Sequence, residues 1–230
     1  MNKNLQAVIL AGGKGTRLGN LGKKVPKAMV DILGIPFVEL LINQLKKKGI
    51  KNFLILTGYK KKFIISYFNK KKNIKIHSGN VNWQTLTRLI KAKPLINNLF
   101  LLMYCDNYLL NYNLKKQIQL IKKKKSKIVL SIVKKKTGQK GTVIFNNSKV
   151  HYKKGISTNY TEAGYILINK FFFFNGIKKI NKRNKMLSNY LNFLSKRGDL
   201  FGMNYGNKYL CVENKKLLQK TRIYFKNKFK

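Results

Sequence analysis

The sequence predicts an α/β fold built on a mostly parallel central sheet, and two features of its 230 residues support that prediction. Along roughly the first 135 residues, short continuous apolar runs alternate with segments whose apolar residues recur at helical spacing, as strands and helices do in doubly wound parallel sheets. From about residue 141 closely spaced strands with turns between them predict a smaller antiparallel part. We therefore expect a single domain over residues 1–230, with halves at about 1–135 and about 136–230.

The elements of the first half follow from their apolar patterns. Residues 5–10 form an unbroken apolar run that ends at Ala11-Gly12-Gly13, which predicts a buried strand. Within residues 36–48 the apolar side chains share one helical face, and Gly49 ends the helix. The same reasoning predicts strands at 53–56, 74–76, 99–103 and 128–133, and helices at 63–68, 86–92 and 114–125.

The sequence of the second half predicts shorter strands and helices. We expect a hairpin turn at Asn146-Asn147, helices at roughly 176–183 and 185–196, and a last helix with Leu218 and Phe225 on its apolar face. The four aromatic residues at 171–174 are expected to pack in the core. The predicted strands are 142–145, 150–152, 163–168, 200–205 and 209–212.

The charge balance is unusual. Fifty Lys and Arg residues face six Asp and Glu residues, a formal net charge of +44 that by itself favours a polyanionic partner. Only five of the fifty are Arg, the residue with the bidentate fork that reads phosphates and bases best. Abundant Lys and Asn also arise by drift in an AT-rich genome. We favour drift, expect no specific nucleic acid, and interpret the scattered Lys runs as solvated ends of elements.

No apolar stretch is long enough for a transmembrane helix, and the first residues lack the features of a signal peptide. Two cysteines, Cys105 and Cys211, are too few for a disulfide framework or a four-cysteine zinc site. These observations predict a soluble, cytoplasmic protein without a membrane span.

The segment of residues 10–18, Leu-Ala-Gly-Gly-Lys-Gly-Thr-Arg-Leu, is the most informative in the chain. It directly follows a predicted strand, and its glycines let successive backbone N–H groups surround an anion. Lys14 and Arg17 add positive charge, and an Arg can grip a pyrophosphate with two hydrogen bonds. The spacing matches neither the P-loop nor the dinucleotide-binding fingerprint.

Two further residues stand at positions suited to phosphate chemistry. Lys27 follows Pro26 in a rigid turn, and Asp106 follows the predicted strand 99–103 at the carboxyl end of the sheet, where open α/β sheets bind ligands. An Asp after a strand is often only a helix cap, and that alternative stays open for Asp106.

Five segments together resemble the sugar-1-phosphate nucleotidyltransferases, whose signature is Gly-Gly-x-Gly-Thr-Arg-Leu, then Pro-Lys, then Gly-Asp after a strand. The resemblance implies a Rossmann-like, GT-A-like nucleotidyltransferase fold. It implies transfer of a nucleotidyl group from an NTP to a sugar 1-phosphate with Mg²⁺, with a nucleotide-binding first half and a sugar-binding second half. The branch it resembles most is the heptose- or mannose-1-phosphate branch of lipopolysaccharide and capsule synthesis. The matching segments are residues 7–18, 25–29, 34–37, 56–59 and 104–107.

The same resemblance implies roles for particular residues. Lys27 would neutralise the α-phosphate region, Asp106 would bind Mg²⁺, and Arg17 would act with both in catalysis. The backbone from Leu10 to Gly12 would face the base. The nucleotide-binding residues would be Leu10, Ala11, Gly12, Gly13, Gly15 and Thr16, with Gln84 and Thr85 beside the base.

Some positions depart from the family pattern. The base-reading segment lacks its glycines, so the base cannot be named, and Trp83 either stacks on it or only packs. On the sugar side Gly141, Lys154 and Glu162 are the candidates. Glu162 would accept bonds from sugar hydroxyls or form a surface ion pair.

The largest departure is Cys211, which falls where the family has its second metal-binding Asp, and a neutral thiol is a poor Mg²⁺ ligand. Either Glu213 substitutes as a metal ligand, or Asp106 and the phosphates suffice, or catalysis is impaired. We therefore expect an enzyme first. A catalytically impaired nucleotide- or sugar-phosphate-binding regulatory protein on the same fold is second, and a basic nucleic-acid-binding protein is third.

Overall fold

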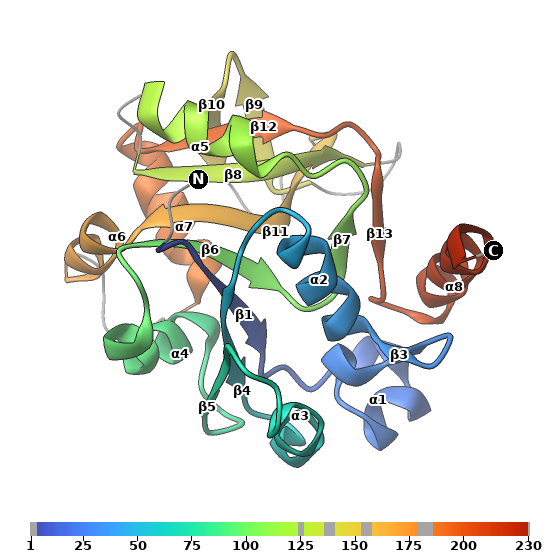
Figure 1. Cartoon of the computed structure of the whole chain (residues 1–230). Coiled ribbons are helices and arrows are strands. Elements are labelled where there is room, and N and C mark those ends of the chain that lie inside the picture. The colour runs from blue at the N-terminus through green and yellow to red at the C-terminus, as the bar shows by residue number, and fades with distance from the viewer. Residues whose placement is uncertain (1–3, 124–126, 136–140, 153–157, 179–185, 230) are drawn as a thin grey trace. The chain divides into compact units, whose positions relative to one another are not determined.

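A computed structural model describes residues 4–123, 127–135, 141–152, 158–178 and 186–229. Helices and strands alternate along the chain, which confirms the α/β class (Figure 1). The chain divides into two compact units. The first comprises Met1–Trp83, Met103–Tyr108 and Leu210–Lys230, and the second comprises Gln84–Leu102 and Leu109–Tyr209.

Three parallel strands organise the first unit. They lie in the order β5 (Ile74–Ser78), β4 (Asn52–Thr57) and β1 (Gln6–Ala11). Every residue of β1 is buried, as is β4 from its second residue on, which explains why these strands appear in the sequence as continuous apolar runs rather than as alternating patterns. All three strands were predicted. Strands β4 and β5 are longer than their apolar runs because pairing extends into the flanking residues, whereas β1 has the length of its run and lies one residue later.

The helices of the first unit are α1 (Asn20–Lys24), α2 (Phe37–Lys46), α3 (Lys61–Phe68) and α8 (Lys215–Phe229). The predicted apolar face of α2 is buried against the core, and α8 buries Leu218, Thr221 and Phe225. A two-strand hairpin, β2 (Asp31–Ile32) and β3 (Ile35–Pro36), turns through Leu33 and Gly34, both at positive φ. Strands β7 (Asn107–Leu109) and β13 (Tyr209–Cys211) form a second small sheet.

The second unit holds a mixed sheet in the order β11 (Tyr160–Asn169), β8 (Ile128–Lys134), β12 (Leu200–Asn204), β10 (Lys149–Tyr152) and β9 (Val143–Asn146). Among these pairs only β8 and β12 are parallel. The predicted change from parallel to mostly antiparallel strands in the second half of the chain is therefore confirmed. The hairpin turn between β9 and β10 lies one residue later than predicted, because Asn147 and Ser148 carry the positive φ angles that a tight hairpin needs.

Helix α5 (Leu114–Lys123) is fixed to this sheet by a buried amide. Gln117 has no exposed surface, and its Nε2 donates to the carbonyls of Val129 and Tyr165, at 2.8 and 3.2 Å. The Tyr112 hydroxyl donates to Gln117 Oε1 at 2.7 Å, and burial raises the pKa of that phenol well above its usual value. Gln117 therefore satisfies backbone groups close to the register shift in β11 between Glu162 and Ile166.

Two predictions in the second unit were wrong in detail. The described start of the helix predicted at 176–183 is the end of α6 (Lys170–Ile177), and residues 179–183 lie outside the described residues. Helix α6 starts earlier than predicted because the Asn169 side chain accepts a bond from the Phe172 N–H. Of the four aromatics, Phe173 and Phe174 are buried as expected, whereas Phe171 is 78% exposed. The remaining helices of this unit are α4 (Thr85–Ala92) and α7 (Leu187–Lys196).

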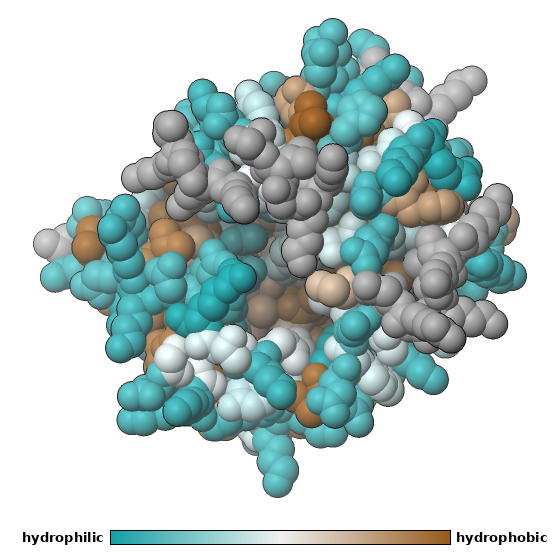
Figure 2. All heavy atoms as spheres, turned by 180° about the vertical axis from the view of Figure 1, so that it is seen from behind, coloured by the Kyte–Doolittle hydropathy of each residue, from teal (hydrophilic) through white to brown (hydrophobic). Residues whose placement is uncertain are grey.

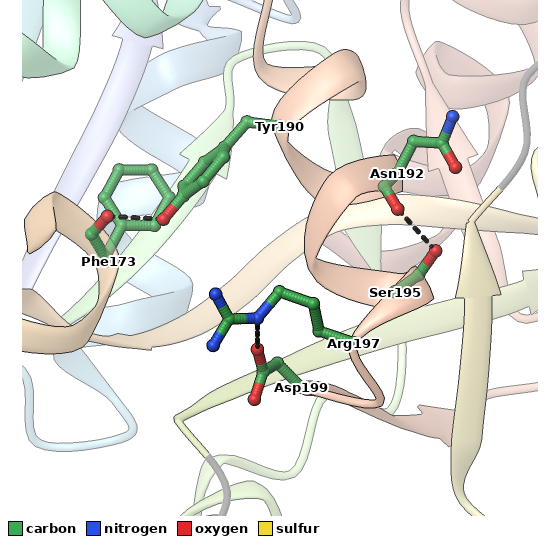
Figure 3. Close-up of polar contacts among 6 residues, drawn as sticks. All are labelled: Phe173, Tyr190, Asn192, Ser195, Arg197 and Asp199. Carbon is green, nitrogen blue, oxygen red and sulfur yellow. Dashed lines mark hydrogen bonds and ion pairs between the residues drawn. The ribbon is translucent and has the colours of Figure 1, made fainter. Parts of the chain in front are cut away.

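Helices α6 and α7 meet through a tyrosine. The Tyr190 hydroxyl donates to the Phe173 carbonyl at 2.5 Å, and its ring packs edge-on against that of Phe173 (Figure 3). A Cβ added at Gly176 would lie 2.1 Å from the same hydroxyl, so only glycine fits there. Beyond the end of α7, Arg197 pairs with Asp199 through Nε and Oδ2 at 3.0 Å.

The described surface is strongly hydrophilic on the face in Figure 2, with small, separated hydrophobic groups. Lys46, Lys47 and Lys48 are exposed around the end of α2, and Lys61 and Lys62 at the start of α3, as expected for solvated helix ends. Among the described helices, none has the length and apolar character needed to cross a membrane.

Candidate active site

The glycine-rich turn begins where β1 ends. Leu10, Ala11 and Gly12 are buried, whereas Gly13, Lys14, Thr16 and Arg17 are exposed. The Gly12 carbonyl accepts a hydrogen bond from the Tyr59 N–H at 3.1 Å, which ties the start of the turn to the end of β4. The start of the turn is therefore held against β4, and its polar groups are exposed to solvent.

Gly15 is required by its conformation and by its neighbour. Its φ is +65°, in the left-handed region, and a Cβ there would lie 3.3 Å from the Cβ of Lys27. A Cβ added at Gly22 would in turn lie 2.5 Å from the Gly15 carbonyl oxygen. This close packing sets the backbone of the turn directly against Lys27.

Lys27 begins a short 3-10 helix, Lys27–Met29, after the extended Pro26. Its Nζ lies 2.9 Å from Oδ2 of Asp106, and the two side chains are 16% and 25% exposed. Asp106 lies in the turn between β6 (Leu99–Tyr104) and β7, so the structure brings together two residues that the sequence analysis selected separately. Asp106 pairs with a lysine here and precedes a strand, which rejects the helix-cap alternative.

Glu213 joins the same group of residues from the C-terminal part of the chain. Its Oε1 forms an ion pair with Nη1 of Arg17, and the two side chains are 38% and 73% exposed. The preceding Val212 N–H donates to the Asp106 carbonyl at 3.0 Å, so the segment that carries Glu213 runs beside Asp106. The first unit therefore gathers two cations and two carboxylates around the glycine-rich turn.

These carboxylates fit a hard cation better than zinc. Among the described residues no group of three or more His, Cys, Asp and Glu side chains lies together, so a site with three or four protein ligands is not formed there. Cys105 and Cys211 are both buried, and burial, with the nearby charge of Asp106, raises the pKa of the Cys105 thiol to about 12. One or two carboxylates, completed by phosphate oxygens and water, match the coordination that Mg²⁺ prefers.

Lys60 is a residue near the turn that the sequence analysis did not select. It has a positive φ of 47°, and its Nζ donates to the Lys24 carbonyl at 3.0 Å. This bond links the end of α1 to the start of α3. Its position directly after the Leu56-Thr57-Gly58-Tyr59 segment could have indicated Lys60 as a site residue. The abundance of lysine in the chain hides that indication.

The ring of Trp83 stacks on that of His77, with ring centroids 6.4 Å apart and planes at 23°. Trp83 therefore has a packing partner of its own, and its stacking on a base stays a prediction. His77 was not selected from the sequence, and its Nε2 is buried without a hydrogen-bond partner among the described atoms.

The remaining candidates lie in the second unit. Gln84 and Thr85 are exposed at the start of α4, where the Thr85 Oγ1 accepts a bond from the Leu187 N–H at 3.0 Å. Gly141 is buried, and a Cβ there would lie 2.3 Å from the Tyr160 carbonyl oxygen, which gives this glycine a packing role. Lys154 lies outside the described residues.

Glu162 is buried in β11, with 8% of its surface exposed. Its Oε1 accepts a hydrogen bond from the Gly164 N–H within the irregular part of the strand. Burial, together with the charge of Glu162, raises the pKa of Tyr152 above its usual value. A sugar-binding role for Glu162 stays a prediction.

Comparison with known proteins identifies the family. A family model described as nucleotidyl transferase matches residues 6–152, which include the glycine-rich turn, Lys27 and Asp106. The chain belongs to the nucleotidyl transferase family.

Two curated relatives illustrate the similarity. The chain is 45% identical over 64 residues to a D-glycero-alpha-D-manno-heptose 1-phosphate guanylyltransferase of Campylobacter jejuni, covering 28% of this chain and 29% of the relative. It is 34% identical over 113 residues to the UTP–glucose-1-phosphate uridylyltransferase AglF of Haloferax volcanii, covering 48% and 46%. These matches span less than half of either relative.

Solved structures show the same fold over nearly the whole chain. HddC from Yersinia pseudotuberculosis matches with a TM-score of 0.78 and 24% identity, covering 96% of this chain and 99% of that one. The inositol-1-phosphate CTP transferase from T. maritima matches with a TM-score of 0.74 and 17% identity, covering 94% and 96%. This member of the nucleotidyl transferase family therefore has the nucleotidyltransferase fold that the sequence predicted.

Proposed function

We propose that the protein transfers a nucleotidyl group from an NTP to a sugar 1-phosphate, releasing pyrophosphate and forming an NDP-sugar. The single observation that carries the proposal is the grouping of Arg17, Lys27 and Asp106 around the glycine-rich turn of a family member. The names of the relatives support a sugar 1-phosphate as the acceptor.

The reaction suits these residues because both reactants are anions. A phosphate oxygen of the sugar 1-phosphate attacks the α-phosphorus in line, forming one P–O bond while the bond to the β-phosphate breaks and pyrophosphate leaves. Positioning and charge neutralisation therefore supply most of the catalysis. Backbone N–H groups of the turn and the guanidinium of Arg17 would hold the β- and γ-phosphates, and Lys27 would neutralise the α-phosphate.

We further propose that Asp106, with Glu213, holds Mg²⁺, which would neutralise phosphate charge when bound. The oxygen ligands and the small number of carboxylates support this choice over a transition metal. Gln84 and Thr85 are proposed to contact the base, and Gly141, Lys154 and Glu162 to contribute to the sugar side. The product would serve surface-polysaccharide synthesis, including lipopolysaccharide or capsule, as the resemblance to the heptose- or mannose-1-phosphate branch implies.

A panel assay tests this function. Pyrophosphate release is measured for each of the common NTPs with a set of sugar 1-phosphates that includes heptose, mannose and glucose, with and without Mg²⁺. Release that needs one NTP, one sugar phosphate and Mg²⁺ together supports the proposal and names both substrates. Nucleotide binding without any release would instead identify a catalytically impaired binding protein.

A further inference from the structure

We infer that the Glu213 carboxylate competes with polyphosphate for the Arg17 guanidinium, and that it thereby lowers the affinity of the glycine-rich turn for pyrophosphate. The inference rests on the proposed function, because it assigns Arg17 to the leaving pyrophosphate. It adds a regulatory role for a carboxylate that is otherwise proposed only as a substitute metal ligand.

The pairing of charges at the turn is the observation that carries it. The guanidinium of Arg17 forms an ion pair with Glu213, so the same group that would grip a polyphosphate already has an anionic partner from the protein. Arg17 is 73% exposed and is the only arginine in the glycine-rich turn. An incoming polyphosphate must therefore displace this carboxylate or share the guanidinium with it.

The backbone on both sides of Glu213 is anchored, which keeps this residue close to Arg17. Before it, the Val212 N–H donates to the Asp106 carbonyl at 3.0 Å. After it, the Asn214 side chain accepts a bond from the Leu217 N–H at 3.0 Å and caps helix α8. The backbone is therefore anchored immediately before and immediately after Glu213.

Such a competitor has a clear use in a chain with a net charge of +44. Lys14 and Arg17 stand exposed on the turn, and product pyrophosphate would leave a site of unopposed cations slowly. When pyrophosphate departs, Glu213 regains Arg17, which lowers the free energy of the empty turn and favours release. The chain has only six acidic residues, and it places one of them against this arginine.

Pyrophosphate binding without metal isolates this effect from any metal role. Affinity is measured by isothermal titration calorimetry in EDTA for wild type and Glu213→Gln. Because an exposed ion pair and its local repulsion of an anion are small effects, the variant should bind pyrophosphate about 1.5- to fivefold more tightly. The matched control is Asp199→Asn, which removes the same charge from an exposed pair with Arg197, outside the turn, and should leave affinity unchanged.

A double-mutant cycle with Arg17→Gln locates the effect. In the Arg17→Gln background, Glu213→Gln should tighten binding less than it does in the wild type, because the shared guanidinium is gone and only the repulsion of the anion by Glu213 is removed. Unchanged or weaker binding by Glu213→Gln, or equal tightening by Asp199→Asn, overturns the inference. If Glu213→Gln does not melt cooperatively, Glu213→Ala replaces it with the same expectation.

The two proposals fail in different ways. If the wild type turns over in the NTP panel but Glu213→Gln binds pyrophosphate no more tightly, only the inference about Glu213 fails. If neither turnover nor pyrophosphate binding occurs in any variant, the proposed function fails and the inference fails with it.

Discussion

Replacing Lys27 by Met tests whether its ion pair with Asp106 serves catalysis or folding. The two charges are 2.9 Å apart, which corresponds to a gross attraction of about 1.4 kcal/mol at the dielectric constant of water and about 6 kcal/mol at an effective value of 20. Desolvation and ordering of both side chains offset most of that attraction. We therefore expect Lys27→Met to lower the free energy of unfolding by only about 1–2 kcal/mol.

For a chain of this length such a loss lowers the melting temperature by about 2–8 °C. Turnover should fall by about 100- to 1,000-fold, since a group aimed at developing phosphate charge acts in the transition state. Circular dichroism melting and pyrophosphate release at saturating substrates measure the two effects separately.

Lys71→Met is the matched control. Lys71 pairs with Glu39 at 2.7 Å, with side chains 35% and 11% exposed, and it lies outside the candidate site. It should lose a similar amount of stability while its specific activity stays at the wild-type level. A Lys27→Met protein with normal specific activity and a large loss of stability would show that Lys27 is structural, and the reasoning would be wrong.

Three further predictions concern the same site and the charge of the chain. Arg17→Ala should weaken NTP binding by about 10- to 150-fold in a folded protein, because charge-assisted bonds contribute about 1.5–3 kcal/mol, and unchanged affinity in calorimetry would contradict the assignment. Asp106→Asn should abolish turnover while NTP binding in EDTA survives, and residual turnover near the wild-type rate would remove Asp106 from the metal site. Duplex DNA binding, measured by fluorescence anisotropy, should be weak and lost at physiological salt, whereas sequence-specific binding that survives about 200 mM salt would favour a nucleic-acid partner.

The sequence predicted those parts of the fold that depend on local pattern. Strands β1 and β4 are buried, so they appear as unbroken apolar runs, and α2 shows its buried face directly in its periodicity. The start of helix α6 was missed because a run of four aromatics has no polar face to mark a period. Its true start was encoded in Asn169, a cap that acts on the backbone three residues later.

By itself the sequence determined the α/β class, the glycine-rich turn after the first strand, and the selection of Lys27 and Asp106, because each of these depends on neighbours within a few residues. Only the tertiary structure decided which charges meet. Nothing local indicates that Lys27 pairs with Asp106 or distinguishes Lys71 among so many lysines, and Glu213 lies almost the whole chain away from Arg17. Ion pairs act through space between residues that folding brings together, so they leave no period or spacing in the sequence from which they could be predicted.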